Sequence, residues 1–261
     1  MRTELLGVPI DAMTFDETVA RAVDAMRSGR LTQHVALNVA KLVKLQHDPD
    51  LRRDVIESHI VGIDGMGIVW GARALGISVP ERVAGVDLMQ ALLAACAREG
   101  FRPYLFGARQ DVLETAVARV MQRWPRLRLA GYRDGYGGAR DEAAAVAAIR
   151  ESAADCLFIG MPTPHKERFL HAHRFRLGVP FIMGVGGGID VLAGHVARAP
   201  APIQRIGLEW LYRIYQEPRR MWWRYLSTNV AFAGMLGKAL VDRALRRGAL
   251  QHRIGKTGRG W

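Results

Sequence analysis

The sequence has few cysteines and no long apolar run. Cys96 and Cys156 are its only cysteines, and they stand far apart in apolar stretches. Their number and spacing indicate neither a disulfide framework nor a zinc site, so a reducing cytoplasm is the expected compartment. No run of about 18 uninterrupted apolar residues exists, which argues against a membrane-spanning helix. Residues 1–11 lack the apolar core of a signal peptide, so none is expected.

Acidic residues are also scarce relative to basic ones. The chain has 37 Lys and Arg against 25 Asp and Glu, a formal net charge of +12. Residues 205–261 hold twelve of the basic residues, only three acidic ones and four of the six tryptophans. Such a segment suits an anionic membrane surface, where each basic residue contributes roughly 1 kcal/mol. Nucleic acid and a merely solvated tail are the alternatives, but four indoles argue against the solvated tail.

The remaining composition is that of an ordinary globular protein. With 261 residues and 49% hydrophobic residues, the chain is long enough for one large domain with an appendage. Short apolar runs alternate with helical patterns, which predicts an α/β fold with a doubly wound, mostly parallel sheet. We place the core at residues 1–204 and a basic, Trp-rich, helical appendage that associates with membranes at residues 205–261. Strands are expected at 5–10, 34–39, 60–63, 103–106, 127–131, 156–159 and 181–185, and helices at 14–26, 41–46, 51–57, 86–98, 112–123, 142–151 and 230–241.

Several notable residues follow predicted strands. Ligands of such sheets bind beyond the carboxyl ends of the strands, and Asn38 and Asp64 both lie there. Asp64 stands between a strand and a helix, where a carboxylate serves as a general base or as a helix N-cap. The spacing by itself favours the cap.

Two loops could meet a phosphate. Gly186 and Gly187 belong to a glycine-rich turn after a strand, which is either a phosphate cradle or a tight packing turn. The turn lacks the spacing of a dinucleotide fingerprint. Lys166 follows another predicted strand, and its side chain is expected either to bind a phosphate or to be solvated. His165, His171 and His173 are candidate metal ligands. No carboxylate or cysteine has the spacing needed to complete a metal site with them, so no metal is expected.

Arginines recur at helical intervals in the basic segment. Arg213, Arg220 and Arg224 are seven and four residues apart, which would let guanidinium groups clamp a diphosphate. An ion-pair face with Glu209 and Glu217 is the alternative.

In this combination the motifs resemble the WecG/TagA/CpsF family, glycosyltransferase family 26. The resemblance runs from about Leu6 to Tyr225. It implies metal-independent, cofactor-free, inverting transfer from a UDP-sugar to a sugar on polyprenyl diphosphate, in cell-surface polysaccharide biosynthesis. It also implies an appendage that docks on the membrane and completes the active site. The matching segments are the Asn38 strand end, Ile63–Gly65, Arg82 with Gly85–Leu88, Leu105–Gly107, Gly160–Glu167, Gly184–Asp190, Arg198–Pro200 and Gly207–Arg213.

The resemblance assigns roles to single residues. Asp64 matches the catalytic base, which favours that role over the cap, and Asn38 matches a residue of the substrate pocket. Gly186, Gly187 and Asp190 match the nucleotide-binding turn. The remaining expected substrate-binding residues are Arg82, Lys166, Glu167, Arg198, Arg213, Arg220 and Arg224.

Two positions depart from the family pattern. Ala36 stands where the family usually has Thr, and Lys166 stands where it usually has Gln. Both departures put the identity of the donated hexose or N-acetylhexosamine in doubt. We expect a cytoplasmic protein, peripheral on the inner face of the cytoplasmic membrane, with no nucleic-acid partner; a homo-oligomer is compatible with the sequence. A nicotinamide-dependent oxidoreductase and a basic nucleic-acid-binding module are the alternative functions.

Overall fold

A six-stranded parallel sheet forms the centre of the protein. The computed structural model describes residues 2–136, 142–205, 207–216 and 218–257. The strands lie in the order β4-β3-β8-β7-β5-β6, and every neighbouring pair is parallel. This confirms the predicted α/β class. The strands are β3 (Thr32–Leu37), β4 (Ile60–Ile63), β5 (Pro103–Gly107), β6 (Gly131–Arg133), β7 (Cys156–Gly160) and β8 (Phe181–Gly184).

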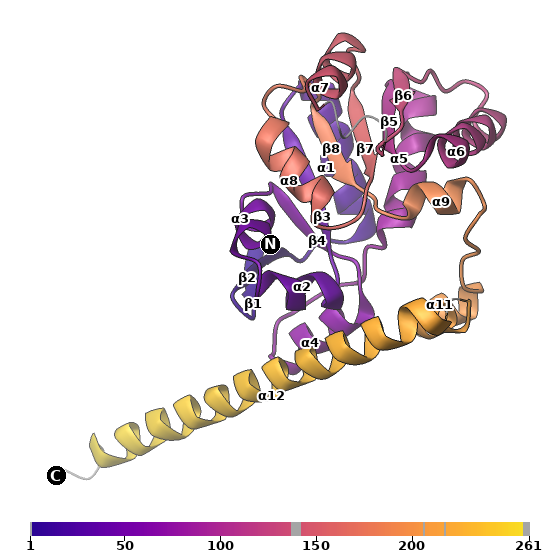
Figure 1. Ribbon diagram of the computed structural model, residues 1–261. Coiled ribbons are helices and arrows are strands. Elements are labelled where there is room, and N and C mark those ends of the chain that lie inside the picture. The colour runs from indigo at the N-terminus through magenta and orange to yellow at the C-terminus, as the bar shows by residue number, and fades with distance from the viewer. Residues whose placement is uncertain (1, 137–141, 206, 217, 258–261) are drawn as a thin grey trace.

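Helices cover both faces of the sheet (Figure 1). One face packs against α1 (Phe15–Ser28), α5 (Gly85–Glu99), α6 (Gln110–Arg123) and α9 (Gly188–Leu192). The other packs against α7 (Glu142–Glu151) and α8 (His165–His173), and α3 (Pro49–Ile56) lies against α8. Alternate residues of β7 point to opposite faces, Phe158 into one cluster and Leu157 into the other. A strand buried on both faces explains its uninterrupted apolar sequence.

Two expected strands differ from the structure. The run at residues 5–10 is not one strand but a hairpin of β1 (Arg2–Leu5) and β2 (Val8–Asp11), which forms a separate antiparallel sheet. Leu6 and Gly7 turn the chain with φ values of 50° and 76°, the left-handed conformation that two-residue hairpin turns require. The strand expected at 127–131 begins only at Gly131, where pairing with β5 starts, and Leu127 instead packs into the hydrophobic cluster that includes α5 and α6.

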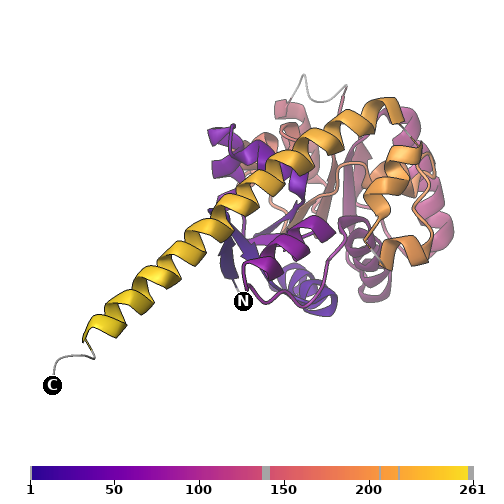
Figure 2. The ribbon, with the colours of Figure 1, turned by 90° about the horizontal axis from the view of Figure 1, so that it is seen from below.

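The C-terminal part is helical, with α10 (Ala201–Arg205), α11 (Glu209–Gln216) and α12 (Pro218–Thr257). Instead of the short helix expected at 230–241, α12 is a single helix of 40 residues. It runs across α2 (Val39–Leu45) and α4 (Met66–Ala74) and extends beyond the body of the protein (Figures 1 and 2). None of the described helices combines the length and the uncharged apolar sequence that spanning a lipid bilayer requires.

Phe232 attaches α12 to the core. Its side chain is 7% exposed and belongs to the hydrophobic cluster that includes β3, β4, α2 and α4. A Cβ atom at Gly71 would lie 2.6 Å from Phe232 Cζ, so the ring needs a glycine at that place on α4. The packing of α12 therefore depends on a residue 161 positions earlier in the chain.

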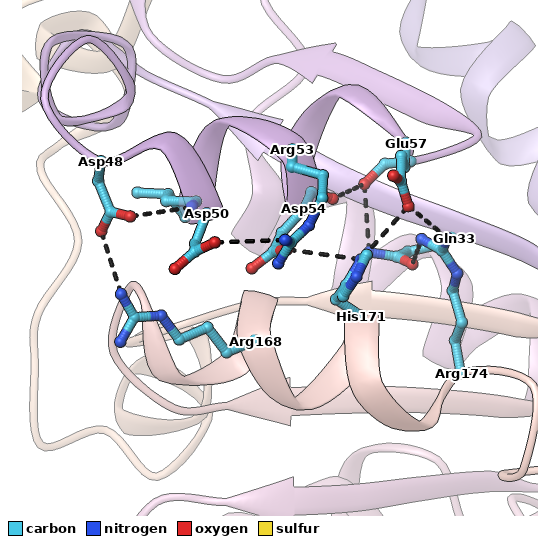
Figure 3. Close-up of polar contacts among 11 residues, drawn as sticks. Gln33, Asp48, Asp50, Arg53, Asp54, Glu57, Arg168, His171 and Arg174 are labelled. Carbon is cyan, nitrogen blue, oxygen red and sulfur yellow. Dashed lines mark hydrogen bonds and ion pairs between the residues drawn. The ribbon is translucent and has the colours of Figure 1, made fainter.

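A polar network joins α3 to α8 (Figure 3). Glu57 lies 2.9 Å from Arg174 and 3.3 Å from His171, and His171 also lies 3.4 Å from the fully buried Asp54. Arg168 reaches Asp48 at 3.4 Å. These contacts hold α8, and the loop that precedes it, beside the strand ends.

The two cysteines meet in the core. Cys96 on α5 and Cys156 on β7 are free thiols with their sulfur atoms 3.6 Å apart. Burial raises the pKa of the Cys156 thiol well above its usual value. Both are therefore packing residues in an apolar setting, as their sequence surroundings indicate.

Replacing Phe232 by Ala tests the attachment of α12. Removal of a buried aromatic ring is expected to weaken the packing by about 3 kcal/mol and raise amide exchange along α12. Val230→Ala is the matched control, because Val230 is 64% exposed on the same helix and should change protection little. Equal exchange in both variants would show that Phe232 does not hold the helix.

Candidate active site

Two cavities open at the carboxyl edge of the sheet. The first, here the apolar cavity, has a volume of about 540 Å³ and lies between α4 and the C-terminal helices. Trp210 and Tyr225 both line it and contact each other as a tilted pair, with ring centroids 5.9 Å apart and an interplanar angle of 51°. Its larger apolar side chains are Met66, Trp70, Trp210, Tyr225, Phe232 and Leu236, and its charged ones are Asp64, Arg82, Arg198 and Glu209.

The second, here the polar cavity, has a volume of about 600 Å³ and lies over the ends of β3 and β8. Three lysines reach it, two from α2 and one from α8. Its lining includes Ala36, Asn38, Lys41, Lys44, Asp64, Thr163, Lys166 and the glycine turn at 184–188. The cavity therefore combines basic side chains with side-chain-free backbone, a combination that suits a phosphate group.

Asp64 lines both cavities. Strand register explains its position, since Leu37 pairs with Ile63 and the next residues, Asn38 and Asp64, leave the sheet side by side. The N-cap of α4 is Gly65, which has no side-chain cap, so Asp64 does not cap its own helix. Its Oδ1 instead accepts a hydrogen bond from the Gly85 N–H at 2.9 Å, which orients the carboxylate at the start of α5. The cap favoured by spacing alone is wrong for α4.

Asn38 caps α2 and also lines both cavities. Its Oδ1 accepts a hydrogen bond from the Lys41 N–H at 3.0 Å. The expected substrate-pocket residue thus has a structural role as well as a place at the junction of the cavities.

A buried ion cluster forms the floor of the polar cavity. Glu167 Oε1 lies 2.8 Å from Lys41 Nζ and 3.1 Å from Lys166 Nζ, and the Lys166 ammonium also donates to Thr163 Oγ1 at 2.6 Å. Burial alone would raise the pKa of Glu167, but the two lysines outweigh it and lower that pKa to about 2. Glu167 is therefore ionised, and it contacts the cavity lysines without lining the cavity itself.

The glycine turn at 184–188 forms another part of the lining of the polar cavity. Gly186 has φ of 52°, which favours glycine, and no atom lies within 4 Å of where its Cβ would be. At Gly184 a Cβ would lie 2.9 Å from Lys166 Cδ, so a side chain there would displace the lysine. The turn both bends the backbone at the cavity and leaves room for Lys166.

Arg82 and Arg198 belong to an ion-pair chain beside the apolar cavity. Glu209 of α11 lies 3.1 Å from Arg82 and 3.5 Å from Arg198, and Arg198 also pairs with Asp87. Burial opposes the charge of Arg198, but Asp87 and Glu209 together raise its pKa. Glu209 therefore binds α11 to two arginines of the core.

His34 lies on β3, two residues before Ala36, which lines the polar cavity. It is 1% exposed, and neither ring nitrogen has a hydrogen-bond partner in the described structure. Burial, with the nearby Lys41 ammonium, lowers the pKa of His34 to about 4, so the ring is neutral near pH 7. A Cβ at Gly62 would lie 2.5 Å from its Nε2, which explains the glycine in β4.

Some expected site residues are not brought to the cavities. Asp190 lies in the first turn of α9 and lines neither of them. The side chains of Arg213, Arg220 and Arg224 lie outside the described residues. His171 and His173 pair with carboxylates of α3 and α7, and the described residues include no group of three or more potential metal ligands.

Three features of the cavities are not indicated by the sequence motifs: Lys41, the contact of Glu209 with the core, and the aromatic wall. Lys41 follows Asn38 by three residues, one turn of helix, and that spacing was its only signal. The contacts of Glu209 with Arg82 and of Phe232 with Gly71 carry no local signal, because these partners lie more than 100 residues away.

A parallel sheet with a carboxylate at the junction of a basic and an apolar cavity is an arrangement that suits an α/β transferase with two chemically different substrates. Residues 3–246 match the model of the glycosyl transferase WecG/TagA/CpsF family. The chain belongs to this family and is a glycosyltransferase, as the sequence motifs predict.

Two similar relatives carry the same name, N-acetylglucosaminyldiphosphoundecaprenol N-acetyl-beta-D-mannosaminyltransferase. The protein of Bacillus subtilis is 34% identical over 175 residues, 67% of this chain and 67% of the relative. That of Bacillus spizizenii is 35% identical over 164 residues, and the aligned segment spans 63% of each chain.

The pKa of His34 predicts a specific pH dependence of stability. Between pH 6.5 and about 4 the unfolded chain binds a proton at this position that the folded chain does not. The free energy of unfolding should therefore fall over this range by up to about 3 kcal/mol as pH is lowered. Urea unfolding of the wild type and of His34→Gln at several pH values measures the difference.

The variant should lack this part of the slope whatever its stability at pH 7. Glu167 does not produce the same signal, because its lowered pKa makes stability fall only between pH 4.5 and about 2. Parallel curves for the two proteins from pH 6.5 to 4 would contradict the neutral His34.

Proposed function

We propose that this chain transfers a sugar from a UDP-sugar to a sugar carried on polyprenyl diphosphate, with inversion, and that Asp64 is the general base. The observation that carries the proposal is the position of Asp64 at the junction of the polar and apolar cavities. The names of the two Bacillus relatives, which specify a lipid-diphosphate-linked acceptor, support it.

The polar cavity takes the donor in this proposal. Lys41, Lys44 and Lys166 and the glycine turn face the place where the UDP diphosphate would lie. As the bond between the anomeric carbon and the UDP oxygen breaks, negative charge develops on the leaving phosphate. Cations and backbone N–H groups that are already in position stabilise that charge without rearrangement.

The apolar cavity takes the acceptor. Its aromatic wall suits a sugar ring and the first part of a lipid chain, and Arg82 and Arg198 lie beside it. The Asp64 carboxylate removes the proton of the acceptor hydroxyl as that oxygen bonds to the anomeric carbon. Attack from the apolar cavity on a donor held in the polar cavity puts nucleophile and leaving group on opposite sides of the carbon, which inverts its configuration.

The identity of the donated sugar is a separate, more specific question. The relatives' names make UDP-N-acetylmannosamine the first donor to test and N-acetylglucosaminyl-diphosphate lipid the first acceptor. Ala36 and Lys166, the two departures from the family pattern, both line the polar cavity. We therefore infer that they act on donor choice. A screen of UDP-hexoses and UDP-N-acetylhexosamines by product mass would identify the donor.

The outer face of the C-terminal helices supports peripheral attachment to the inner face of the cytoplasmic membrane. Phe232 points into the core, whereas Trp222, Leu226 and Val230 are 57%, 43% and 64% exposed. Their four-residue spacing places them along one face of α12. Trp223 and Tyr215 are 71% and 83% exposed. An apolar, Trp-bearing face on a basic helix is typical of a segment that lies in the lipid interface.

Asp64→Asn tests the general base. The amide cannot take a proton but keeps nearly the same shape, so UDP affinity should stay within about threefold. Transfer should fall by roughly 10²–10⁴-fold, the usual contribution of a general base. Product mass reports transfer, and isothermal titration calorimetry reports UDP affinity.

Asp111→Asn is the matched control, because Asp111 is an exposed carboxylate on α6 outside both cavities. It should transfer at the wild-type rate. Near-normal turnover of Asp64→Asn would remove Asp64 as the base, and loss of UDP binding would assign it to substrate binding instead.

A double substitution of Trp222 and Trp223 by Ala tests membrane attachment. Loss of two exposed indoles should raise the lipid concentration needed for half-maximal sedimentation with anionic vesicles at least about tenfold. Phe175→Ala is the control, since Phe175 is 76% exposed after α8, outside the C-terminal helices. Wild-type sedimentation of the double variant would place the membrane contact elsewhere.

A further inference from the structure

Lys41 is held as a buried cation at the polar cavity. It stands in the first turn of α2, its side chain is 7% exposed, and it lines the cavity. Its ammonium lies 2.8 Å from Glu167 Oε1. The ammonium group of a lysine usually reaches solvent. A buried ammonium group at the lining of a cavity therefore indicates a site where the positive charge contacts a ligand.

The same carboxylate oxygen holds a second cation. Lys166 Nζ lies 3.1 Å from Glu167 Oε1, and its side chain is also 7% exposed. The two ammonium groups come from α2 and α8 and meet at one point because Glu167 lies between them. One lysine would be enough to pair with Glu167 and join the two helices. With two lysines around one carboxylate, the three groups together carry a net positive charge.

Neighbouring groups keep this charge directed at the cavity. His34 is neutral near pH 7, because burial and the Lys41 ammonium lower its pKa to about 4, so it adds no third cation to the cluster. Gly184 leaves the space through which the Lys166 stem passes. Lys44, on the same helix as Lys41, lines the cavity from a more exposed place.

We propose that Lys41 binds a phosphate of the donor together with Lys166, and that Glu167 is the positioning residue that holds the two ammonium groups as a pair. The proposal rests on the donor site assigned above. It adds a residue that no motif of the sequence indicates, and it gives the buried Glu167 a role through the lysines rather than through substrate contact.

Binding of UDP and uridine to Lys41→Gln tests the phosphate contact. The glutamine amide still donates to Glu167 but has no charge, so UDP affinity should fall about tenfold or more while the affinity for uridine stays the same. Lys238→Gln, which removes one exposed charge on α12, controls for net charge and should bind both ligands like the wild type. Lys41→Arg should recover part of the UDP affinity.

Three outcomes would overturn the proposal for Lys41. They are unchanged UDP affinity in Lys41→Gln, an equal loss for UDP and uridine, and an equal loss in Lys238→Gln. Inorganic pyrophosphate separates this proposal from the proposed function. If the wild type binds pyrophosphate through Lys41 but does not bind UDP, the proposed UDP-sugar donor is contradicted and the proposed phosphate site at Lys41 is supported.

Glu167→Gln tests the positioning role by pH. Glu167, Lys166 and His34 face the Lys41 ammonium, and Asp64 and Lys44 line the same cavity. Without the carboxylate, two buried ammonium groups repel each other and one loses its proton more easily. UDP affinity of the variant should therefore fall as pH rises from 6 to 9, while that of the wild type stays flat. A flat profile in both would leave Glu167 with a purely structural role.

Discussion

The parallel register of β3 with β4 and β8 is the constraint on which the site depends. Leu37 stands opposite Ile63, and Val35 stands opposite Gly184. Asn38, Asp64 and the glycine turn therefore leave the sheet at nearly the same height. A shift of one residue in either pairing would turn the following side chain to the other face and separate the carboxylate from the turn. The chemistry of the site thus begins with backbone hydrogen bonds that involve none of its side chains.

The C-terminal helices add the second half of the site. Phe232 packs against Gly71, Glu209 binds Arg82 and Arg198, and residues of α12 form much of the apolar wall. The polar cavity belongs mostly to the sheet and its loops, and the apolar cavity belongs mostly to this added layer. In the proposed function, the core binds the soluble donor. The outer helices complete the site for the lipid-held acceptor.

The sequence predicts the sheet well and the contacts poorly. Residues 60–63 and 142–151 form the expected strand and helix to the residue, because period and flanking breakers agree there. Residues 5–10 do not, since an apolar run hides the turn at Leu6 and Gly7. Asp64 was predicted as a site residue, because ligands of parallel sheets bind beyond the carboxyl ends of the strands. Lys41 was not predicted, because a lysine in a helix is normally solvated. Its burial becomes evident only from its ion pair with Glu167, 126 residues later in the chain.

One property of α12 limits how its sequence can vary. The helix carries Phe232 on the side that faces the core and Val230 on the side that faces away. Each residue added to a helix rotates everything after it by about 100°. One residue inserted between Trp222 and Thr228 would therefore move Phe232 out of its pocket and turn the outward apolar face toward a different direction. Point substitutions can alter either face alone, whereas a change in length shifts both faces together, so the phase of this helix is more constrained than its composition.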